Sequence, residues 1–166
     1  MSSIRIKLPD GSVQEFAAGI TPLAVADQLS PRLAREAVAA KVNDRLVDLP
    51  FPIESDAELT IITAETEEGL EVMRHSAAHL MAQAIRRVVP GTKLAIGPVV
   101  DNRFYYDVDP PRPISAEDFP AIEAEMARIV QEDLPIVRIE MSKDEAERFF
   151  RENDEPYKLE LVSELE

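Results

Sequence analysis

The two histidines of the chain lie in one short motif, His75-Ser76-Ala77-Ala78-His79. If this segment is helical, residues four apart share one face, with their Cβ atoms about 5–6 Å from each other. The three residues between the histidines are small, so a substrate could approach this face closely. Because imidazole titrates near neutral pH and commonly transfers protons in hydrolysis, the motif favours proton-transfer chemistry.

Two other interpretations of the histidine pair stay open. Two histidines at this spacing could bind a metal ion, as in the His-Glu-x-x-His motif of zinc proteases. The glutamate of that motif is absent and the chain has no cysteine, so any further ligand would have to be a carboxylate. Alternatively, both imidazoles could be partly buried and hydrogen-bonded to the backbone. We expect no metal site in this chain.

An aromatic cluster and a lysine supply further candidate groups. Phe104-Tyr105-Tyr106 contains three of the nine aromatic residues, and on a strand Tyr105 would face away from the other two. One face must pack in the core, whereas a tyrosine on the other could stack on a base or hydrogen-bond a ligand. Lys158 could stabilise an oxyanion beside a pocket, although an isolated lysine is more commonly a surface charge.

Basic residues are concentrated around the histidines. The whole chain has 18 Lys+Arg and 32 Asp+Glu residues, and its formal net charge is −14. Residues 74–103, in contrast, contain five basic residues and a single acidic one, Asp101. A strongly acidic chain is not expected to bind phosphate over its whole surface, so any nucleic-acid contact must be local. The basic segment either provides that contact or pairs with nearby acidic side chains.

Length and composition exclude several classes of protein. With 166 residues, 45% of them apolar, the chain can form one domain or two small ones. It has no run of 18 apolar residues that would indicate a membrane span, and its first residues lack the apolar region of a secretory signal. The absence of cysteine excludes disulfide scaffolds, thiolate zinc sites and cysteine nucleophiles. We expect a cytoplasmic protein without a membrane partner.

Residues 1–63 are predicted to form a β-grasp domain. Alternating apolar residues, a Pro-Asp-Gly turn and a Thr-Pro helix start indicate a hairpin, one helix and further short strands. The strands are predicted at 4–8, 13–16, 37–42 and 59–62, and the helix opens at Thr21 and runs to Leu29. This domain contains no histidine and no glycine-rich phosphate loop, so we expect a binding or docking module.

Residues 64–166 are predicted to form a second, α+β domain that begins with the polar segment 64–69. Its helices are predicted at 70–89, 116–131 and 142–151, and its strands at 94–100, 104–109, 136–141 and 157–161. Ser115 with Asp118, and Ser142 with Glu145, match the pattern of a capping box. We expect these helices to pack on an antiparallel or mixed sheet.

Three motifs, in this order, resemble the editing domain of bacterial threonyl-tRNA synthetases. They are HSAAHL at 75–80, AIGPVVDN at 95–102 and FYYD at 104–107. Residues 4–63 resemble the TGS domain that precedes it, a ubiquitin-like β-grasp module also found in some GTPases and stringent-response synthetases. Alanyl-tRNA synthetases and free-standing editing proteins share the two-histidine motif but lack this module, which favours the threonyl family.

The resemblance implies that a second site hydrolyses mischarged seryl-tRNA(Thr). Serine lacks one methyl group of threonine, and such a contact is worth only about 1–3 kcal/mol, too little for accurate selection in one step. The histidines would position the attacking water and the ribose hydroxyl, and the lysine would stabilise charge on the ester oxygen. The implied residues are His75, His79 and Lys158 for catalysis; Tyr106, Asp101 and Asn102 for substrate binding; and Arg86, Arg87 and Lys93 for tRNA contact.

The chain also departs from the family pattern. Arg103 stands where many relatives have glycine. A later segment with a cysteine and a further histidine, and the synthetic domain with its ATP and zinc sites, do not occur before Glu166. We therefore expect an N-terminal region that is truncated within the editing domain, that cannot aminoacylate and that has little editing activity alone.

The expected cofactors and partners follow from that interpretation. No cofactor is expected in this chain, because ATP and zinc are implied only for the absent catalytic domain. The expected partners are the acceptor end of tRNA(Thr) and the rest of the synthetase, which would dimerise through its catalytic domain. The alternative is a free-standing, non-catalytic module that binds tRNA or protein through a degenerate editing fold.

Overall fold

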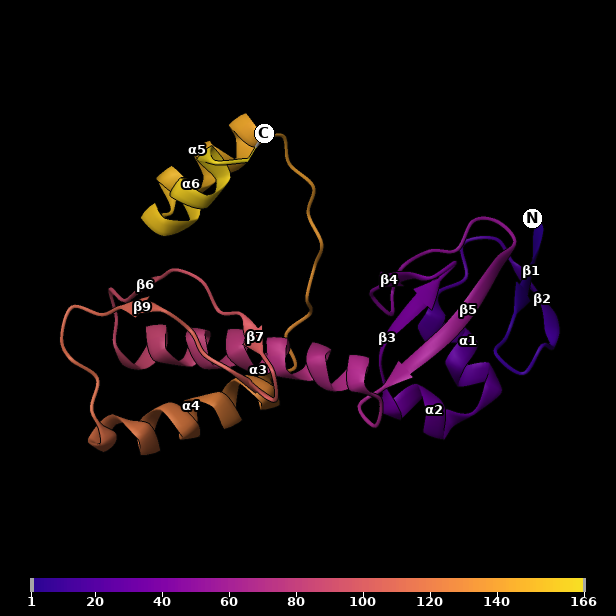
Figure 1. The fold of residues 1–166 in the computed structure, drawn as a ribbon, viewed down its shortest axis with the longest axis horizontal. Helices are drawn as coiled ribbons and strands as arrows, with labels where there is room; N and C mark the ends of the chain where they lie inside the picture. Colours follow the sequence, from indigo (N-terminus) through magenta and orange to yellow (C-terminus); the bar gives the residue numbers. More distant parts are fainter. Residues whose placement is uncertain (1, 166) are drawn as a thin grey trace. The chain divides into compact units, whose positions relative to one another are not determined.

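The computed structural model describes residues 2–165, and its contacts divide the chain into two compact units, Met1–Met73 and Arg74–Glu166 (Figure 1). The division falls within helix α3 (Glu67–Val88) rather than in the polar segment 64–69. The first turn of α3 belongs to the first unit because it lies against strand β5 (Ala57–Thr63). A Cβ atom on Gly69 would be 1.9 Å from the carbonyl oxygen of Thr63.

The first unit is built on one five-stranded sheet with the order β2-β1-β5-β3-β4. Strand β1 pairs in parallel with β5 and antiparallel with β2, and the other neighbours are antiparallel. The remaining strands and the two helices are β1 (Ser3–Lys7), β2 (Val13–Ala17), β3 (Ala37–Val42), β4 (Arg45–Val47), α1 (Pro22–Leu29) and α2 (Pro31–Glu36). This arrangement confirms the predicted β-grasp architecture.

Local sequence signals explain most of the first unit. On β1, Ile4 and Ile6 are buried while their neighbours are exposed, as the alternating pattern requires. The Thr21 hydroxyl accepts a hydrogen bond from the backbone N–H of Ala24 at 3.2 Å and so caps α1. Helix α2 was not predicted, although Ser30 and Pro31 repeat the same start signal; the helix has only six residues and none is buried.

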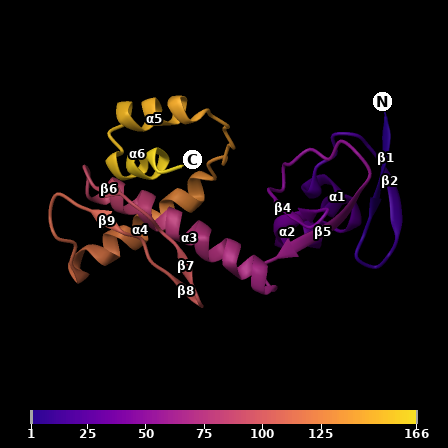
Figure 2. The same ribbon diagram turned by 45° about the horizontal axis from the view of Figure 1, so that its top comes forward.

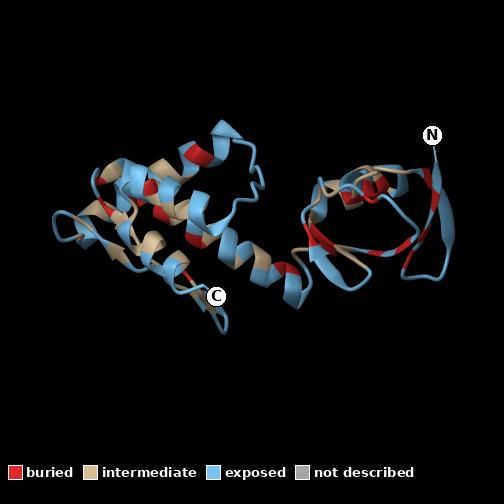
Figure 3. Ribbon diagram, turned by 90° about the horizontal axis from the view of Figure 1, so that it is seen from above, coloured by how far each residue is buried: buried red, intermediate tan, exposed pale blue. Residues whose placement is uncertain are grey.

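The second unit is organised around α3, whose buried residues are drawn red in Figure 3. Ala84 and Ile85 of α3 pack with Ile122 and Ile129 of α4 (Phe119–Glu132) in one apolar cluster. A short 3₁₀ turn at residues 116–118 precedes α4, so the predicted helix at 116–131 is correct apart from its first turn. None of the helices within residues 2–165 is both long and apolar enough to cross a membrane.

The predicted strands 94–100 and 104–109 form one antiparallel hairpin with an interrupted ladder. Its outer part pairs β7 (Val99–Val100) with β8 (Arg103–Phe104), and its inner part pairs β6 (Lys93–Leu94) with β9 (Val108–Asp109). Between them, the N–H of Asp107 donates to the carbonyl of Ile96 at 2.8 Å. The ladder is interrupted near Pro98, because proline has no N–H to donate.

The turn of this hairpin explains why Arg103 is compatible with the fold. Asp101 adopts the positive φ of 52° that the two-residue turn needs, and Asp tolerates this conformation better than most residues. Arg103 lies after the turn, where it pairs with Val100 in the ladder. Glycine is therefore not required at position 103 in this chain.

Two predicted strands of the second unit are wrong. Residues 136–141 keep the alternating pattern, but they lie in an exposed extended segment and pair with no strand among residues 2–165. Residues 157–161 belong to helix α6 (Pro156–Ser163), which Pro156 initiates at its first position. A five-residue apolar alternation is too short to distinguish a strand from the first turns of a helix.

The C-terminal part of the second unit is a pair of contacting helices. Helix α5 (Lys143–Glu152) starts at the predicted capping box, in which the Glu145 carboxylate accepts from the N–H of Ser142 at 2.9 Å. Figures 1 and 2 show α5 and α6 side by side. The fold class is α+β, as predicted, although the sheet of this unit consists of two short antiparallel ladders.

Ile129 and Ile136 provide a matched pair of substitutions in the second unit. Ile129 is only 7% exposed, whereas Ile136 is 94% exposed. Ile129→Ala is expected to lower the free energy of unfolding by about 2–5 kcal/mol, because it leaves a cavity in the core. Ile136→Ala is expected to change it by less than about 0.5 kcal/mol. Urea denaturation followed by circular dichroism would measure both values, and equal losses would contradict the described burial.

Candidate functional site

Helix α3 presents the two histidines side by side on its surface. The Nε2 atoms of His75 and His79 lie 3.1 Å apart, and the two rings meet edge to face with centroids 4.7 Å apart. At this distance one Nε2 carries a proton that the other accepts, so the two imidazoles act as one hydrogen-bonded unit. The i, i+4 spacing therefore produces the shared face that it predicts.

Tyr106 lies next to this pair because a glycine makes room for its ring. The rings of His79 and Tyr106 are 5.8 Å apart at their centroids, again in an edge-to-face arrangement. A Cβ atom on Gly97 would lie 2.2 Å from Cδ2 of Tyr106, so no other residue fits at position 97 without displacing the ring. Sequence reasoning did not single out Gly97, although a glycine within a strand often marks a close approach of this kind.

Lys158 reaches the same place from α6. Its Nζ atom donates to the carbonyl oxygen of Ala95 at 2.7 Å and to the hydroxyl of Tyr106 at 3.3 Å. An ammonium group has three donors, so one remains for a ligand. The fold thus brings together four side chains that are separated by up to 83 positions along the chain: His75, His79, Tyr106 and Lys158.

The surroundings of His79 favour its neutral form. Partial burial lowers the pKa of His79, and electrostatic interactions with His75 and Lys158 lower it further. A neutral imidazole has a lone pair that can accept a proton at physiological pH. His79 is therefore available as a base at neutral pH.

Asp101 and Asn102 lie in the exposed turn between β7 and β8. The Asn102 side-chain oxygen accepts a hydrogen bond from Arg74 at 3.3 Å, which joins the turn to α3 one residue before His75. Within residues 2–165, no hydrogen bond joins Asp101 or Asn102 to the two histidines or to Lys158. Their predicted role in substrate binding stays a prediction.

The three basic residues predicted to contact tRNA are all paired with carboxylates. Arg87 donates to Glu125 at 3.1 Å and to Glu132 at 2.8 Å, and these contacts raise the pKa of its guanidinium. Arg86 pairs with Glu155, and Lys93 pairs with Asp154. These contacts match the alternative interpretation of the basic segment, in which it pairs with nearby acidic side chains.

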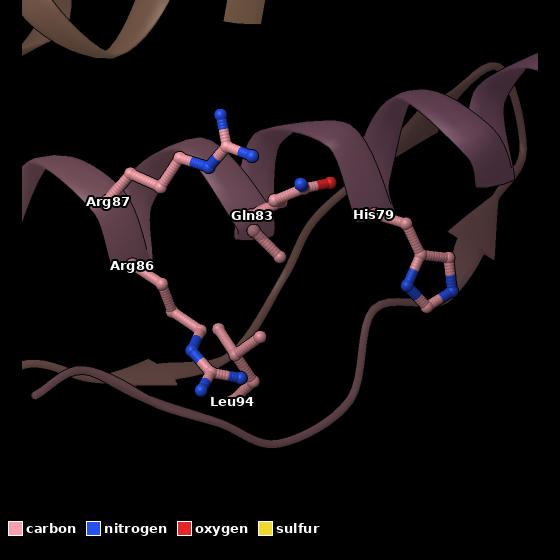
Figure 4. A pocket seen from close by; sticks show the side chains of 6 residues that line it. His79, Gln83, Arg86, Arg87 and Leu94 are labelled. Atoms are coloured by element: carbon pink, nitrogen blue, oxygen red, sulfur yellow. The ribbon is translucent and has the colours of Figure 1, made fainter. Parts of the chain in front are cut away.

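A cavity of about 490 Å³ adjoins the histidine pair along α3 (Figure 4). In Figure 4, Gln83 lies between His79 and Arg86 on the helix, and Leu94 faces Arg86 from the neighbouring strand. The complete lining is His79, Ala82, Gln83, Arg86, Arg87 and Leu94. An imidazole, an amide and two guanidinium groups around an apolar floor suit a ligand with polar and anionic parts.

Within residues 2–165, no group of three or more His, Asp or Glu side chains is arranged to hold a metal ion. The histidine pair therefore gains no third protein ligand from the elements around it. A metal centre of the kind found in zinc hydrolases needs three such ligands.

The contact between Gly97 and Tyr106 can be tested with a double-mutant cycle. Gly97→Ala is expected to destabilise the second unit by about 1–3 kcal/mol, because the new methyl group overlaps the Tyr106 ring. In a Tyr106→Ala background the same substitution should cost much less. Urea denaturation of the four proteins measures the coupling, and an identical cost in both backgrounds would rule out the close approach.

The depressed pKa of His79 can be measured by following its ring protons by NMR during a pH titration. We expect a value below the ordinary 6.5, and Lys158→Met should move it upwards because one positive charge is removed. Lys41→Met, in the first unit, is the control and should leave it unchanged.

The same shift has a consequence for stability. Because the unfolded chain binds the His79 proton near pH 6.5 and the folded chain only at lower pH, stability falls as the pH drops through this range. A His79→Gln variant should lose part of this dependence. A His79 pKa above 6.5 would contradict the electrostatic description of the site.

Comparison with known proteins identifies relatives for both units. The TGS domain family matches residues 4–63. The threonine–tRNA ligase of Symbiobacterium thermophilum is 51% identical over 164 residues, which cover 99% of this chain and 25% of the relative. The corresponding enzyme of Carboxydothermus hydrogenoformans is 52% identical over 162 residues, 98% of this chain and 26% of the relative.

A third threonine–tRNA ligase, from Rubrobacter xylanophilus, is 51% identical over 160 residues. This alignment covers 96% of the chain and 25% of the relative. The chain thus spans about a quarter of the length of the curated relatives that it matches. Residues 4–63 match the TGS domain family, and over nearly its whole length the chain is similar to the N-terminal region of threonine–tRNA ligases.

Proposed function

We propose that residues 74–166 contribute the histidine pair of an editing site that hydrolyses seryl-tRNA(Thr) in a threonine–tRNA ligase. The observation that carries this proposal is the convergence of His75, His79, Tyr106 and Lys158 from three separate parts of the fold. The similarity to threonine–tRNA ligases supports it, because a ligase for threonine needs a way to remove serine.

The chemistry of the proposed reaction is the hydrolysis of an ester. A water molecule adds to the carbonyl carbon of the seryl ester and gives up a proton, and the bond to the ribose oxygen then breaks. His79, neutral at physiological pH, accepts the proton from water, and the histidine pair returns a proton to the leaving ribose oxygen. The products are serine and tRNA with a free terminal hydroxyl.

Lys158 supplies the electrostatic part of the proposed mechanism. Two of its N–H groups are already engaged by Ala95 and Tyr106, which hold the ammonium in a defined position. The remaining N–H can donate to the ester oxygen as negative charge develops on it. A fixed charge in a partly dehydrated site stabilises this transition state more than a mobile surface lysine would.

Binding of the tRNA acceptor end would use the surface next to the histidines. The cavity beside His79 offers an amide and two guanidinium groups to a polar, anionic ligand. A phosphate at Arg86, Arg87 or Lys93 would have to compete with the carboxylates that pair with these residues. A contact of any of these three residues with tRNA therefore requires that a phosphate displaces the carboxylate partner.

The remaining functions of a threonine–tRNA ligase are assigned to other parts of a longer protein. We propose that aminoacylation, with its ATP and zinc sites, and the dimer contact lie outside the region that this chain covers. The relatives are long enough to contain such additional domains, since the chain spans about a quarter of their length. We also propose that the protein is cytoplasmic and that tRNA(Thr) is its main partner.

The test is a deacylation assay with seryl-tRNA(Thr). A ligase of the relatives' length that begins with this chain should release serine, whereas His75→Ala and His79→Ala should each lower the rate by about 10²–10⁴-fold. Ser76→Ala, an exposed neighbour on the same helix, is the matched control and should retain the activity. The wild-type rate should fall as the pH is lowered through the His79 pKa, because protonated His79 cannot accept a proton.

The outcomes separate the alternatives. Robust hydrolysis by the 166-residue chain alone would contradict the expected need for a later segment. Binding of tRNA by the long protein without any hydrolysis would favour the non-catalytic binding module. A deacylation rate that rises in proportion to the metal content of the purified protein, measured by elemental analysis, would favour a metal hydrolase built on the two histidines.

A further inference from the structure

The segment 154–158 leads into the site and is held there by polar contacts from other elements. The backbone carbonyl of Asp154 accepts a hydrogen bond from Lys93 at 3.0 Å, and its carboxylate pairs with the same amine. Glu155 pairs with Arg86 of α3. Two consecutive residues are thus bound to two different elements, β6 and α3, immediately before α6 begins.

A third contact lies next to Lys158 itself. The hydroxyl of Tyr157 donates to the carboxylate of Asp109 on β9 at 2.9 Å. Tyr157 and Lys158 are adjacent, so this bond fixes the backbone directly beside the amine that reaches Tyr106. All three contacts therefore lie within four residues of Lys158 and point to the same part of the second unit.

Apolar packing cannot replace these contacts. Neither α5 nor α6, both wholly within the described residues, contains a buried side chain. The segment before them, residues 134–141, contains only exposed residues and pairs with no strand in the described part of the chain. The pair of helices is therefore held mainly by side-chain hydrogen bonds and ion pairs at 154–158.

Burial makes one of these pairs stronger than an ordinary surface ion pair. The side chain of Glu155 is only 12% exposed, although that of Arg86 is 47% exposed. A pair with one partly dehydrated member is screened less by water and salt than a fully exposed pair. Loss of Arg86 would leave the Glu155 carboxylate partly buried without a partner, so α6 would move to bring it back into water.

We propose that Arg86, Lys93 and Asp109 are positioning residues, which hold the start of α6 so that Lys158 reaches Tyr106. In this role each of the three residues acts through a contact within the chain. The catalytic consequence rests on the proposed editing function, whereas the structural consequence, a fixed Lys158 amine, does not. The two can therefore be tested separately.

Exchange of the two charges distinguishes a positioning role from a tRNA contact. In Arg86→Glu the pair with Glu155 becomes a repulsion, and α6 should detach. Adding Glu155→Arg restores the pair with reversed charges, which should restore the position of Lys158. If Arg86 instead bound a phosphate, the double variant would stay defective, because position 86 would still be acidic.

The first readout needs no activity and uses the 166-residue chain. Acetylation by a limiting amount of the N-hydroxysuccinimide ester of acetic acid, followed by mass spectrometry, reports how accessible the Lys158 amine is. Arg86→Glu should raise the labelling of Lys158 by about threefold or more, because local detachment exposes the amine. The double variant should return it to the original level.

Two further variants keep this test independent of a folding defect. Tyr157→Phe removes only the hydroxyl that donates a hydrogen bond to Asp109. This variant should also raise the labelling of Lys158. Arg32→Glu breaks an exposed ion pair with Glu36 in the first unit and is the matched control, with no change expected at Lys158. Unchanged labelling of Lys158 in both Arg86→Glu and Tyr157→Phe would overturn the positioning role.

The second readout is deacylation of seryl-tRNA(Thr) by the long ligase. Arg86→Glu should lower kcat by about 10- to 100-fold, because a displaced amine no longer meets the ester oxygen, and the charge exchange should restore most of it. Restored labelling without restored hydrolysis would overturn the claim that Arg86 acts within the chain. If the unsubstituted ligase shows no hydrolysis, the proposed function fails while the labelling result still decides the positioning role.

Discussion

The periodicity of helix α3 is the constraint on which the second unit depends. With 3.6 residues per turn, the face with Ala78, Ala82 and Ile85 is buried, and the histidine pair is left at the surface. Ile85 and the small residue Ala84 of the same helix pack with the isoleucines of α4 in the apolar cluster. A shift of the helix by one residue would bury an imidazole and expose an apolar side chain. The core and the candidate site are therefore two faces of one element.

Charge pairing holds the other elements of this unit to α3. The chain has many more acidic than basic residues, and Arg86, Arg87 and Lys93 each have a carboxylate partner from a later part of the chain. Exposed pairs contribute only about 0–1 kcal/mol each, so no single pair determines the fold. Their combined effect is geometric, because they specify where α4 and the start of α6 lie against the histidine helix. The positive charges of these three residues are therefore paired with carboxylates of the same chain.

How far the sequence could predict the fold depended on the range of the interactions involved. The Thr21 cap and the Ser142 capping box are contacts between residues close in sequence, and residue types predict both of them. The strand predicted at 136–141 failed, because a strand needs a partner that the pattern cannot reveal. Helix α6 was mistaken for a strand for a related reason, since five alternating residues fit both structures.

The sequence by itself determined the histidine pair, since the i, i+4 spacing on a helix places both imidazoles on one face wherever that helix lies. It also determined the β-grasp architecture of the first unit, whose strands and turns have strong local signals. Only the tertiary structure decided that Lys158 reaches Tyr106, that Gly97 must lack a side chain, and that Arg86 and Arg87 are paired with carboxylates. These facts depend on contacts between residues far apart in the chain, and such contacts exist only after the elements have packed.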